Sequence, residues 1–253
     1  MKAGIFRAVA NFYSQYVDYP LDTLVPRERK IIHSKVRDSG KLCALCAVAL
    51  GDSLLISARK EIVPAAEQIA DTLGCPGNII APAVCDQLLS VCSRILSEPD
   101  RLCYYSGVKL YCDQETFKRA VDRNVRKVNQ ADMSGIMKRF YTYTKPDDAE
   151  CIEAALAGDC AFAYFLDDEP VSFCTTHHGY MSDRIGNLCV QGTLEQHRCR
   201  GYGKATASAT TDNILRQGRI PVWGTSIDNI ASIKTAKAIG YQVFCYVLEI
   251  RHR

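Results

Sequence analysis

The stretch LCVQGTLEQHRCRGYGKA, residues 188–205, decides how the rest of this chain is interpreted. It begins as an apolar strand and passes through a turn that contains Gly201 and Gly203, and a helical pattern starts at Lys204. Backbone N–H groups at the start of a helix lack intrahelical partners, and the helix dipole adds partial positive charge there. Because glycine lets the main chain approach a ligand closely, we expect a phosphate-binding turn.

Two commoner phosphate-binding motifs do not fit this turn. A dinucleotide-binding fingerprint requires a third glycine at position 206, which is Thr206. A P-loop requires glycine at position 198 and Ser or Thr after the lysine, where Arg198 and Ala205 stand. The turn carries Arg198, Arg200 and Lys204 instead, and their positive charges favour an anion.

The sequence RCRGYG at residues 198–203 resembles the pyrophosphate loop of the GNAT superfamily of N-acetyltransferases, whose signature is Gln/Arg-x-x-Gly-x-Gly/Ala. Downstream, NIASIKTAKAIGY at residues 229–241 resembles the Asn-x-x-Ser/Ala…Gly-Phe/Tyr helix that lies beside the pantetheine arm in that family. The order of elements from Val125 onward also resembles the superfamily fold. The three matches cover about half of the chain and imply an acyltransferase that uses acetyl-CoA.

The resemblance implies which residues bind the cofactor. Main-chain N–H groups of the turn would hold the pyrophosphate, while Asn229 and Ser232 would contact the pantetheine or the product thiol. The predicted set is Leu188, Cys189, Val190, Arg198, Cys199, Arg200, Gly201, Tyr202, Gly203, Lys204, Ala205, Asn229 and Ser232. We predict no metal.

In this family the acceptor amine attacks the thioester directly in a ternary complex, so that positioning supplies much of the rate. The resemblance implies that the backbone N–H of Val190 polarises the thioester carbonyl as an oxyanion donor. Asn187 stands where many relatives carry a Glu base, and Ala236 stands where many carry a Tyr acid. This sequence therefore lacks both of the usual proton-transfer side chains.

Other groups must then supply the base, because an ammonium group has no lone pair. The candidates are His177 and Glu195, with His178, Asp183, water or the substrate as open alternatives. Ordinary surface roles remain open for the histidines and for Glu195. A thiolate leaving group needs little acid help, since its ordinary pKa is about 8.5.

Three functions are compatible with these residues. The first is acetyl transfer from acetyl-CoA to the primary amine of a small molecule. The second is a CoA-binding sensor or interaction module without catalysis, which the residues at positions 187 and 236 keep open. The third is an aminoacyl transferase that uses charged tRNA; the intact glycines and the low net charge of +3 disfavour it.

The alternation of strand and helix signals predicts an α/β fold of the α+β type with a mixed sheet. We expect two domains, residues 1–120 and residues 121–253, the second with the acyl-CoA N-acyltransferase fold. In the second domain the expected strands are Val125–Val128, Cys160–Leu166, Val171–Thr176, Ile185–Thr193, Ile220–Thr225 and Tyr241–Ile250, and the expected helices end near Thr142, Ala157, Arg216 and Ala238.

The first 120 residues are a mixed α/β segment without a chemical motif. Helices are expected at Lys2–Tyr16, Pro64–Leu73 and Pro82–Leu96, and strands at Leu42–Leu50, Leu54–Ser57 and Cys103–Tyr111, with a turn at Ser106-Gly107. An additional N-terminal half is similar to the layout of a bacterial subgroup that includes zwittermicin-resistance acetyltransferases. We expect this half to shape the acceptor site.

The composition is that of an ordinary globular protein, with 47% hydrophobic and 23% charged residues among 253. A net charge of +3 without a dense basic run argues against a nucleic-acid partner. The longest apolar stretch, Leu42–Leu50, is too short to span a membrane. We expect a cytoplasmic protein; the sequence leaves the oligomeric state open, a dimer included.

The 13 cysteines do not form the pattern of a secreted disulfide scaffold, because their number is odd and no signal peptide precedes them. Most lie in apolar patterns, where Cys behaves as a small buried hydrophobe. Cys43 and Cys46 form a CxxC without a second ligand pair at metal spacing, which favours a structural role over a metal site.

Overall fold

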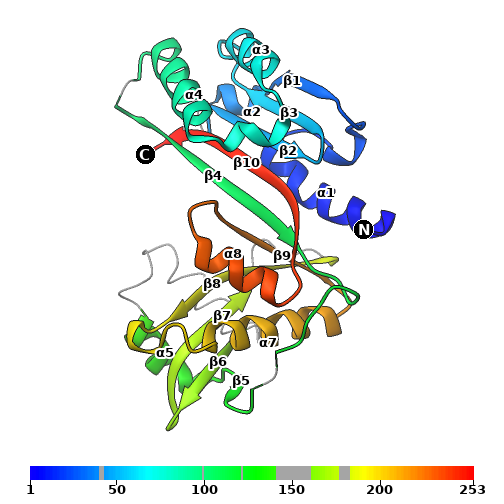
Figure 1. Cartoon of the computed structure of the whole chain (residues 1–253). Helices are drawn as coiled ribbons and strands as arrows, with labels where there is room; N and C mark the ends of the chain where they lie inside the picture. The colour runs from blue at the N-terminus through cyan, green and yellow to red at the C-terminus, as the bar shows by residue number, and fades with distance from the viewer. Residues whose placement is uncertain (40–42, 99, 121, 141–160, 177–182) are drawn as a thin grey trace. The chain divides into compact units, whose positions relative to one another are not determined.

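The computed structural model describes residues 1–39, 43–98, 100–120, 122–140, 161–176 and 183–253 (Figure 1). The contact pattern divides the chain into two compact units. Unit 1 contains Met1–Lys109, Thr225–Asn229 and Val243–Arg253, and unit 2 contains Leu110–Gly224 and Ile230–Gln242. The expected boundary after residue 120 lies inside unit 2, so the domain limits stay a prediction.

Unit 1 is a sheet with helices on both faces. Its strands follow the order β1-β3-β2-β10-β4, in which β1 and β3 are parallel and β2 is antiparallel to both β3 and β10. The elements are α1 (Ala3–Val17), η1 (Leu21–Thr23), β1 (Arg29–His33), α2 (Lys35–Asp38), β2 (Leu45–Leu50), β3 (Ser53–Ala58), α3 (Val63–Thr72), η2 (Pro76–Ile80), α4 (Pro82–Ile95), β4 (Leu102–Tyr111) and β10 (Gln242–His252).

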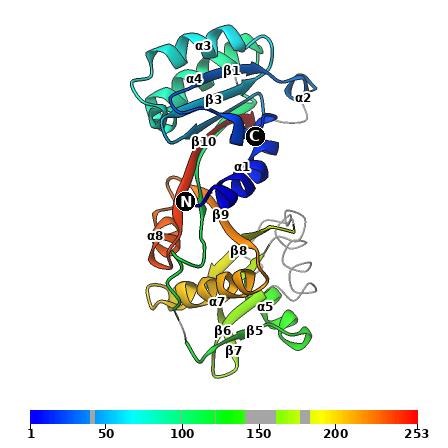
Figure 2. The same ribbon diagram turned by 90° about the vertical axis from the view of Figure 1, so that its right-hand side faces the viewer.

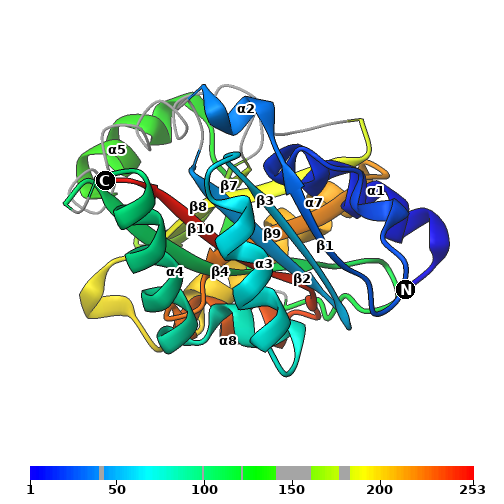
Figure 3. The same ribbon diagram turned by 90° about the horizontal axis from the view of Figure 1, so that it is seen from above.

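Both faces of β2 are buried, as its nearly continuous apolar sequence implies. Leu45, Ala47 and Ala49 belong to the core cluster that includes residues of α3 and α4, which lie over these strands in Figure 3. Because strand side chains alternate, Cys46 and Val48 point to the opposite face. The two faces of β2 therefore have different surroundings.

The strands of unit 2 follow the order β9-β8-β7-β6-β5 and are antiparallel except for the parallel pair β8–β9. α7 packs on β6, β7 and β8 (Figure 2). The elements are β5 (Val125–Lys127), η3 (Gln130–Asp132), α5 (Met133–Phe140), β6 (Ala161–Leu166), β7 (Glu169–Thr176), β8 (Ile185–Thr193), η6 (Glu195–His197), α7 (Tyr202–Arg216), β9 (Ile220–Ser226) and α8 (Ile230–Ala238).

The two faces of β7 in unit 2 contact different helices. Phe173 packs against Phe140 of α5, with ring centroids 4.6 Å apart. The neighbouring Ser172 faces α7, since its hydroxyl lies 3.5 Å from that of Thr206, and strand alternation puts Cys174 on the same face. α5 and α7 therefore cover opposite faces of this sheet.

The expected mixed α/β fold is confirmed, and β8 has the predicted bounds Ile185–Thr193. α7 begins at Tyr202, two positions before the expected Lys204. The strand β1 was not expected. The end of the helix expected from Asp132 to Thr142, the whole helix expected to end at Ala157, and His177 and His178 lie outside the described residues.

The predicted turn at Ser106-Gly107 is wrong, because both residues lie inside the continuous strand β4. The glycine has another physical reason. A Cβ at Gly107 would approach the hydroxyl oxygen of Tyr105 to 2.6 Å, so the Tyr105 ring occupies the space that a side chain would need. The glycine that suggests a turn in the sequence is therefore explained by its packing against Tyr105.

Candidate functional site

The first turn of α7 presents main-chain donors without a capping side chain. Gly201 is the N-cap residue and has the left-handed conformation, with φ 87° and ψ −3°. The first helical hydrogen bond runs from Ala205 N–H to the Gly201 carbonyl at 3.0 Å. The N–H groups of Tyr202, Gly203 and Lys204 precede this bond, which leaves them as orphan donors of the helix start. The turn is therefore built to accept an anion or water.

Gly201 is required by its backbone conformation rather than by crowding. Its positive φ is one that residues with a Cβ rarely adopt, yet a Cβ built there would meet no atom within 4 Å. Cys199 has a positive φ of 61° as well. Both residues are exposed, so the turn opens to solvent beside these donors.

Gly203 has a different role, because it packs against the sheet. A Cβ there would lie 3.1 Å from Thr193 Oγ1 and 3.3 Å from Gln191 Nε2. The Gln191 side chain donates to the Gly203 carbonyl at 2.6 Å, and the Thr206 hydroxyl donates to the same oxygen at 3.1 Å. The sequence analysis did not single out Gln191 and Thr193, which fix the helix start on β8.

Basic and aromatic side chains surround the turn. Arg200 and Lys204 are exposed, and Arg198 donates from Nε to the carbonyl of Thr193 at 3.3 Å. The ring of Tyr202 stacks on Tyr164 with centroids 4.1 Å apart. Tyr202 therefore has a packing role, whereas the guanidinium and ammonium groups add positive charge around the turn.

A bulge interrupts β8 just before this turn. The register with β7 pairs Cys174 with Gln191 and Thr176 with Leu188, so that Cys189 and Val190 stand opposite one residue of β7. Such a bulge takes a residue out of the ladder and re-aims the strand. The predicted oxyanion donor Val190 belongs to this bulge.

β8 and β9 are paired only along their first residues. The parallel register runs from Ile185–Ile220 to Leu188–Trp223, after which β8 continues to Thr193 and β9 to Ser226. Asn187 is half-buried and Leu188 is buried. The bulge thus follows Leu188, the last residue of β8 in this register, which is a suitable place for a main-chain donor to meet a ligand.

The residues predicted on the last helix divide between the two units. Ser232, in unit 2, accepts a hydrogen bond from the indole N–H of Trp223 at 3.0 Å. Asn229 is exposed and belongs to unit 1, where its N–H donates to the carbonyl of Ser226. Ala236 is fully buried, so its position has no contact with solvent. Glu195 is exposed in η6.

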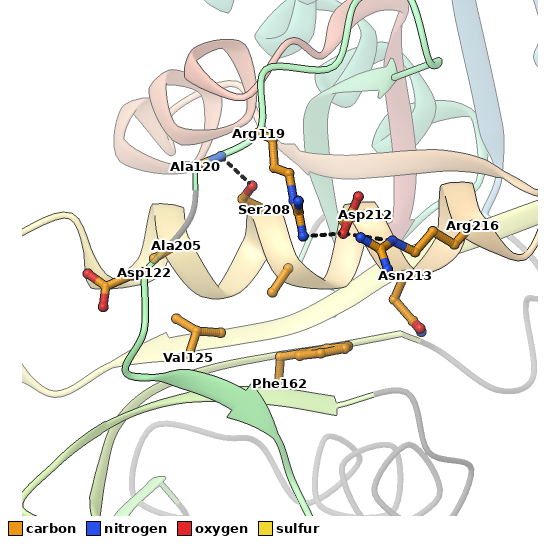
Figure 4. A pocket seen from close by; sticks show the side chains of 11 residues that line it. Arg119, Ala120, Asp122, Val125, Phe162, Ala205, Ser208, Asp212, Asn213 and Arg216 are labelled. Carbon is orange, nitrogen blue, oxygen red and sulfur yellow. Dashed lines mark hydrogen bonds and ion pairs between the residues drawn. The ribbon is translucent and has the colours of Figure 1, made fainter.

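A cavity of about 280 Å³ opens on another side of α7 (Figure 4). Its walls come from α7, from the segment that precedes β5, and from the strands β5 and β6. The lining residues are Arg119, Ala120, Asp122, Val125, Phe162, Ala205, Ser208, Ala209, Asp212, Asn213 and Arg216. Asp212 lies 3.0 Å from both Arg119 and Arg216, which neutralises its charge. Of the predicted cofactor residues, Ala205 lines this cavity, which is distinct from the donors of the turn.

No group of three or more metal-ligating side chains occurs within the described ranges. Among the helices of these same ranges, none is long and apolar enough to cross a bilayer.

Comparisons with known proteins agree with this geometry. Residues 176–248 match the family model described as FR47-like protein. A GNAT-family acetyltransferase from Colwellia psychrerythraea superposes with a TM-score of 0.51 at 10% identity, over 66% of this chain and 62% of that one. No curated protein sequence is significantly similar to this chain.

Two further solved structures are less similar in shape. A GCN5-related N-acetyltransferase from Kribbella flavida gives a TM-score of 0.47 at 13% identity, over 62% of each chain. The aminoglycoside N-acetyltransferase AAC(6')-Iy in complex with CoA gives 0.40 at 22% identity, over 49% of this chain and 90% of that one. This chain thus spans less than two thirds of the first two acetyltransferases compared. The likeness to the Colwellia acetyltransferase shows that this chain has the GNAT fold, and residues 176–248 resemble the FR47-like family.

Proposed function

We propose that this chain is an N-acetyltransferase that transfers the acetyl group of acetyl-CoA to the primary amine of a small molecule, by direct attack in a ternary complex. The observation that carries the proposal is the uncapped start of α7, with Gly201 in the left-handed conformation, which follows the bulged strand β8 and the short helix η6. The two features join an anion-binding turn to a main-chain donor in one segment.

The residues of the turn fit the pyrophosphate of CoA. The orphan N–H groups of Tyr202, Gly203 and Lys204 would donate to phosphate oxygens, and the open space beside Gly201 admits the anion. Exposed Arg198 and Arg200 would add charge and orientation. Leu188, Cys189 and Ser232, all of unit 2, remain proposed contacts of the pantetheine.

The acetyl group would be activated by the main chain of β8. The thioester carbonyl gains negative charge as the amine attacks, and the Val190 N–H would stabilise this charge as an oxyanion donor. The tetrahedral intermediate then collapses with loss of the CoA thiolate, which is a good leaving group. Ala236 is buried and has no acidic proton, so the thiolate would take its proton from solvent.

Proton removal from the amine needs a group other than Asn187, whose amide is not a base. We propose His177 or Glu195 for this step, with a bound water or the substrate's own second amine as the other routes. Glu195 is exposed and carries a carboxylate that water can reach. The Glu195→Gln variant tests this role, because loss of a base lowers kcat and shifts the acidic limb of the pH profile.

Titration of acetyl-CoA into variants of Gly201 tests the binding site. Gly201→Asp places a carboxylate beside the pyrophosphate, and at 4–5 Å each pair of charges costs about 3–4 kcal/mol at an effective dielectric of 20. We expect at least a hundredfold loss of affinity in calorimetry. Gly201→Asn is the matched control, since asparagine tolerates the left-handed conformation and adds no charge. It should weaken binding only several-fold; equal affinities for the two variants would contradict the assignment.

Asn187 and Ala236 stand where many relatives carry the Glu base and the Tyr acid. They therefore also support a second function, a CoA-binding module without catalysis. Thiol release measured with a panel of primary amines distinguishes the two. Turnover that depends on an amine supports the enzyme, whereas tight acetyl-CoA binding without thiol release supports the module.

A further inference from the structure

The guanidinium of Arg37 is buried in unit 1 without an acidic partner. Only 1% of this residue is exposed, and among the described residues no carboxylate forms an ion pair with it. Its neutral partners are Ser57 Oγ at 2.9 Å from Nε, the Cys43 carbonyl at 3.1 Å from Nη1 and the Tyr16 carbonyl at 2.5 Å from Nη2. Because arginine keeps its proton, a charge buried in this way strongly favours a nearby anion.

The nearest group that can become an anion is the thiol of Cys43. Arg37 Nη1 lies 2.6 Å from Cys43 Sγ. Cys43 is half-buried, so solutes can still reach it. A hydrogen bond with Cys46 lowers the pKa of Cys43; burial opposes this effect, and the charge of Arg37 adds to it. The contact with Arg37 and the lowered pKa together favour the thiolate form of Cys43.

The second cysteine of the CxxC has the opposite environment. Cys46 lies in β2 with 1% of its surface exposed, and the register of β10 places Glu249 directly across from it. The hydrogen bond with Cys43 and burial raise the pKa of Cys46 well above its usual range, and the charge of Glu249 adds to this. One sulfur is therefore half-buried beside a cation with a lowered pKa, and its partner is buried with a raised pKa.

We propose that Cys43 and Cys46 are a redox-active dithiol that exchanges with low-molecular-weight disulfides of the glutathione class, with Cys43 as the attacking sulfur and Cys46 as the resolving one. A thiolate in contact with a buried guanidinium, next to a protected thiol, is the arrangement that thiol–disulfide exchange needs. This activity belongs to unit 1 and is independent of acetyl transfer.

The exchange balances without another redox partner. The Cys43 thiolate attacks one sulfur of the glutathione disulfide, forms a mixed disulfide and expels one glutathione thiolate, which takes a proton from solvent. Cys46 then loses its proton, with Glu249 across the ladder as the proposed acceptor, and attacks the Cys43 sulfur. The second glutathione thiolate leaves, so two protein thiols are oxidised while one small disulfide is reduced to two thiols.

Alkylation of the whole chain tests the attacking sulfur. The protein is treated with iodoacetamide from pH 5.5 to pH 9, and each cysteine is quantified by peptide mass spectrometry. We expect Cys43 to react at least tenfold faster than exposed Cys75 at pH 6, with a pH midpoint below that of Cys75. Arg37→Met should remove this advantage, with folding checked by circular dichroism. Equal rates and midpoints for the two cysteines in the wild-type protein would overturn the proposal.

Incubation with glutathione disulfide tests the resolving sulfur. The wild-type protein should form an intramolecular bond between Cys43 and Cys46, and Cys46→Ser should accumulate glutathione on Cys43. Cys43→Ser should form neither product and leave Cys46 reduced. Glutathione found on Cys75 or Cys199 while Cys43 of the Cys46→Ser variant stays reduced would overturn the proposal. Acetyl-CoA titration of the same variants separates this result from the fate of the proposed acetyl transfer.

Discussion

Two regions of this chain present donors that favour negative charge, and they differ in their access to water. The first turn of α7 in unit 2 is exposed and lacks a capping side chain. The guanidinium of Arg37 in unit 1 is buried and has its acceptors within the protein. In the first region, water satisfies the donors until a ligand replaces it. In the second, the protein must supply the anion.

The difference teaches how burial decides between binding and reactivity. Exposed donors lose little when no ligand is present, so they can serve a cofactor that comes and goes. A buried cation without a carboxylate pays a desolvation penalty, and this penalty falls when a neighbouring thiol gives up its proton. We therefore expect the same kind of charge to select an external anion at α7 and to favour an internal thiolate at Cys43.

Replacing one arginine by methionine in each region should give the largest difference in the free energy of unfolding. Arg37→Met should lower the free energy of unfolding by about 3 kcal/mol, because the carbonyls of Tyr16 and Cys43 and the hydroxyl of Ser57 lose a buried donor. Arg200→Met, at an exposed position, should change it by less than about 0.5 kcal/mol. Urea unfolding measures both. A cost below about 1 kcal/mol for Arg37→Met would contradict the distinction between a buried and an exposed arginine.

Gly203 offers a smaller effect, since it belongs to the packed side of the α7 turn. Gly203→Ala should destabilise the protein by about 1 kcal/mol, because a new Cβ crowds Thr193 and Gln191 by more than the better helix propensity of alanine recovers. Thr193 Oγ1 is tied to Ser172 at 2.8 Å and cannot move away freely.

A double-mutant cycle checks this explanation. In a Thr193→Ala background the crowding oxygen is absent, so Gly203→Ala should be neutral or stabilising in urea unfolding. An unchanged cost of Gly203→Ala in that background would show that another contact, not Thr193, requires the glycine.

The smallest expected effect is at the exposed ion pair of Arg126 and Asp132, just before α5. Asp132 accepts from both Arg126 Nη1 at 2.6 Å and Nη2 at 2.8 Å, and from the Asn129 N–H at 2.9 Å. The hydrogen bonds from Arg126 lower the pKa of Asp132. At neutral pH, Asp132→Asn should cost about 1 kcal/mol at most, as expected of an exposed pair.

The pH dependence of this cost has a definite sign. A carboxyl whose pKa is lowered by folding contributes stability that is fully present above its unfolded pKa of about 3.9. That contribution is lost as the pH falls through the lower, folded pKa. The difference in thermal midpoint between Asp132→Asn and the wild type should therefore be constant near neutral pH and shrink below about pH 4. A difference that grows on acidification would contradict it.

The order of elements in unit 2 could be predicted because each one has a local signal. Strand alternation marks Ile185–Thr193, and the glycines at 201 and 203 mark the turn that follows it. Local signals failed where the sheet decides the outcome. Ser106-Gly107 looks like a turn in the sequence, but both residues lie inside β4, where the Tyr105 ring occupies the space that a side chain at position 107 would need.

The sequence by itself determined that a strand enters a glycine turn and a helix, because φ preferences and hydrophobic periodicity are properties of neighbouring residues. Only the tertiary structure decided that Gly203 packs on β8, that β8 bulges at Cys189 and Val190, and that Arg37 is buried against Cys43. Each of these depends on strand register or on burial, which is set by contacts between segments far apart in the chain. The CxxC motif does not show this difference by itself; the hydrogen bond between the two cysteines, their burial and the guanidinium beside Cys43 move the two thiol pKa values in opposite directions.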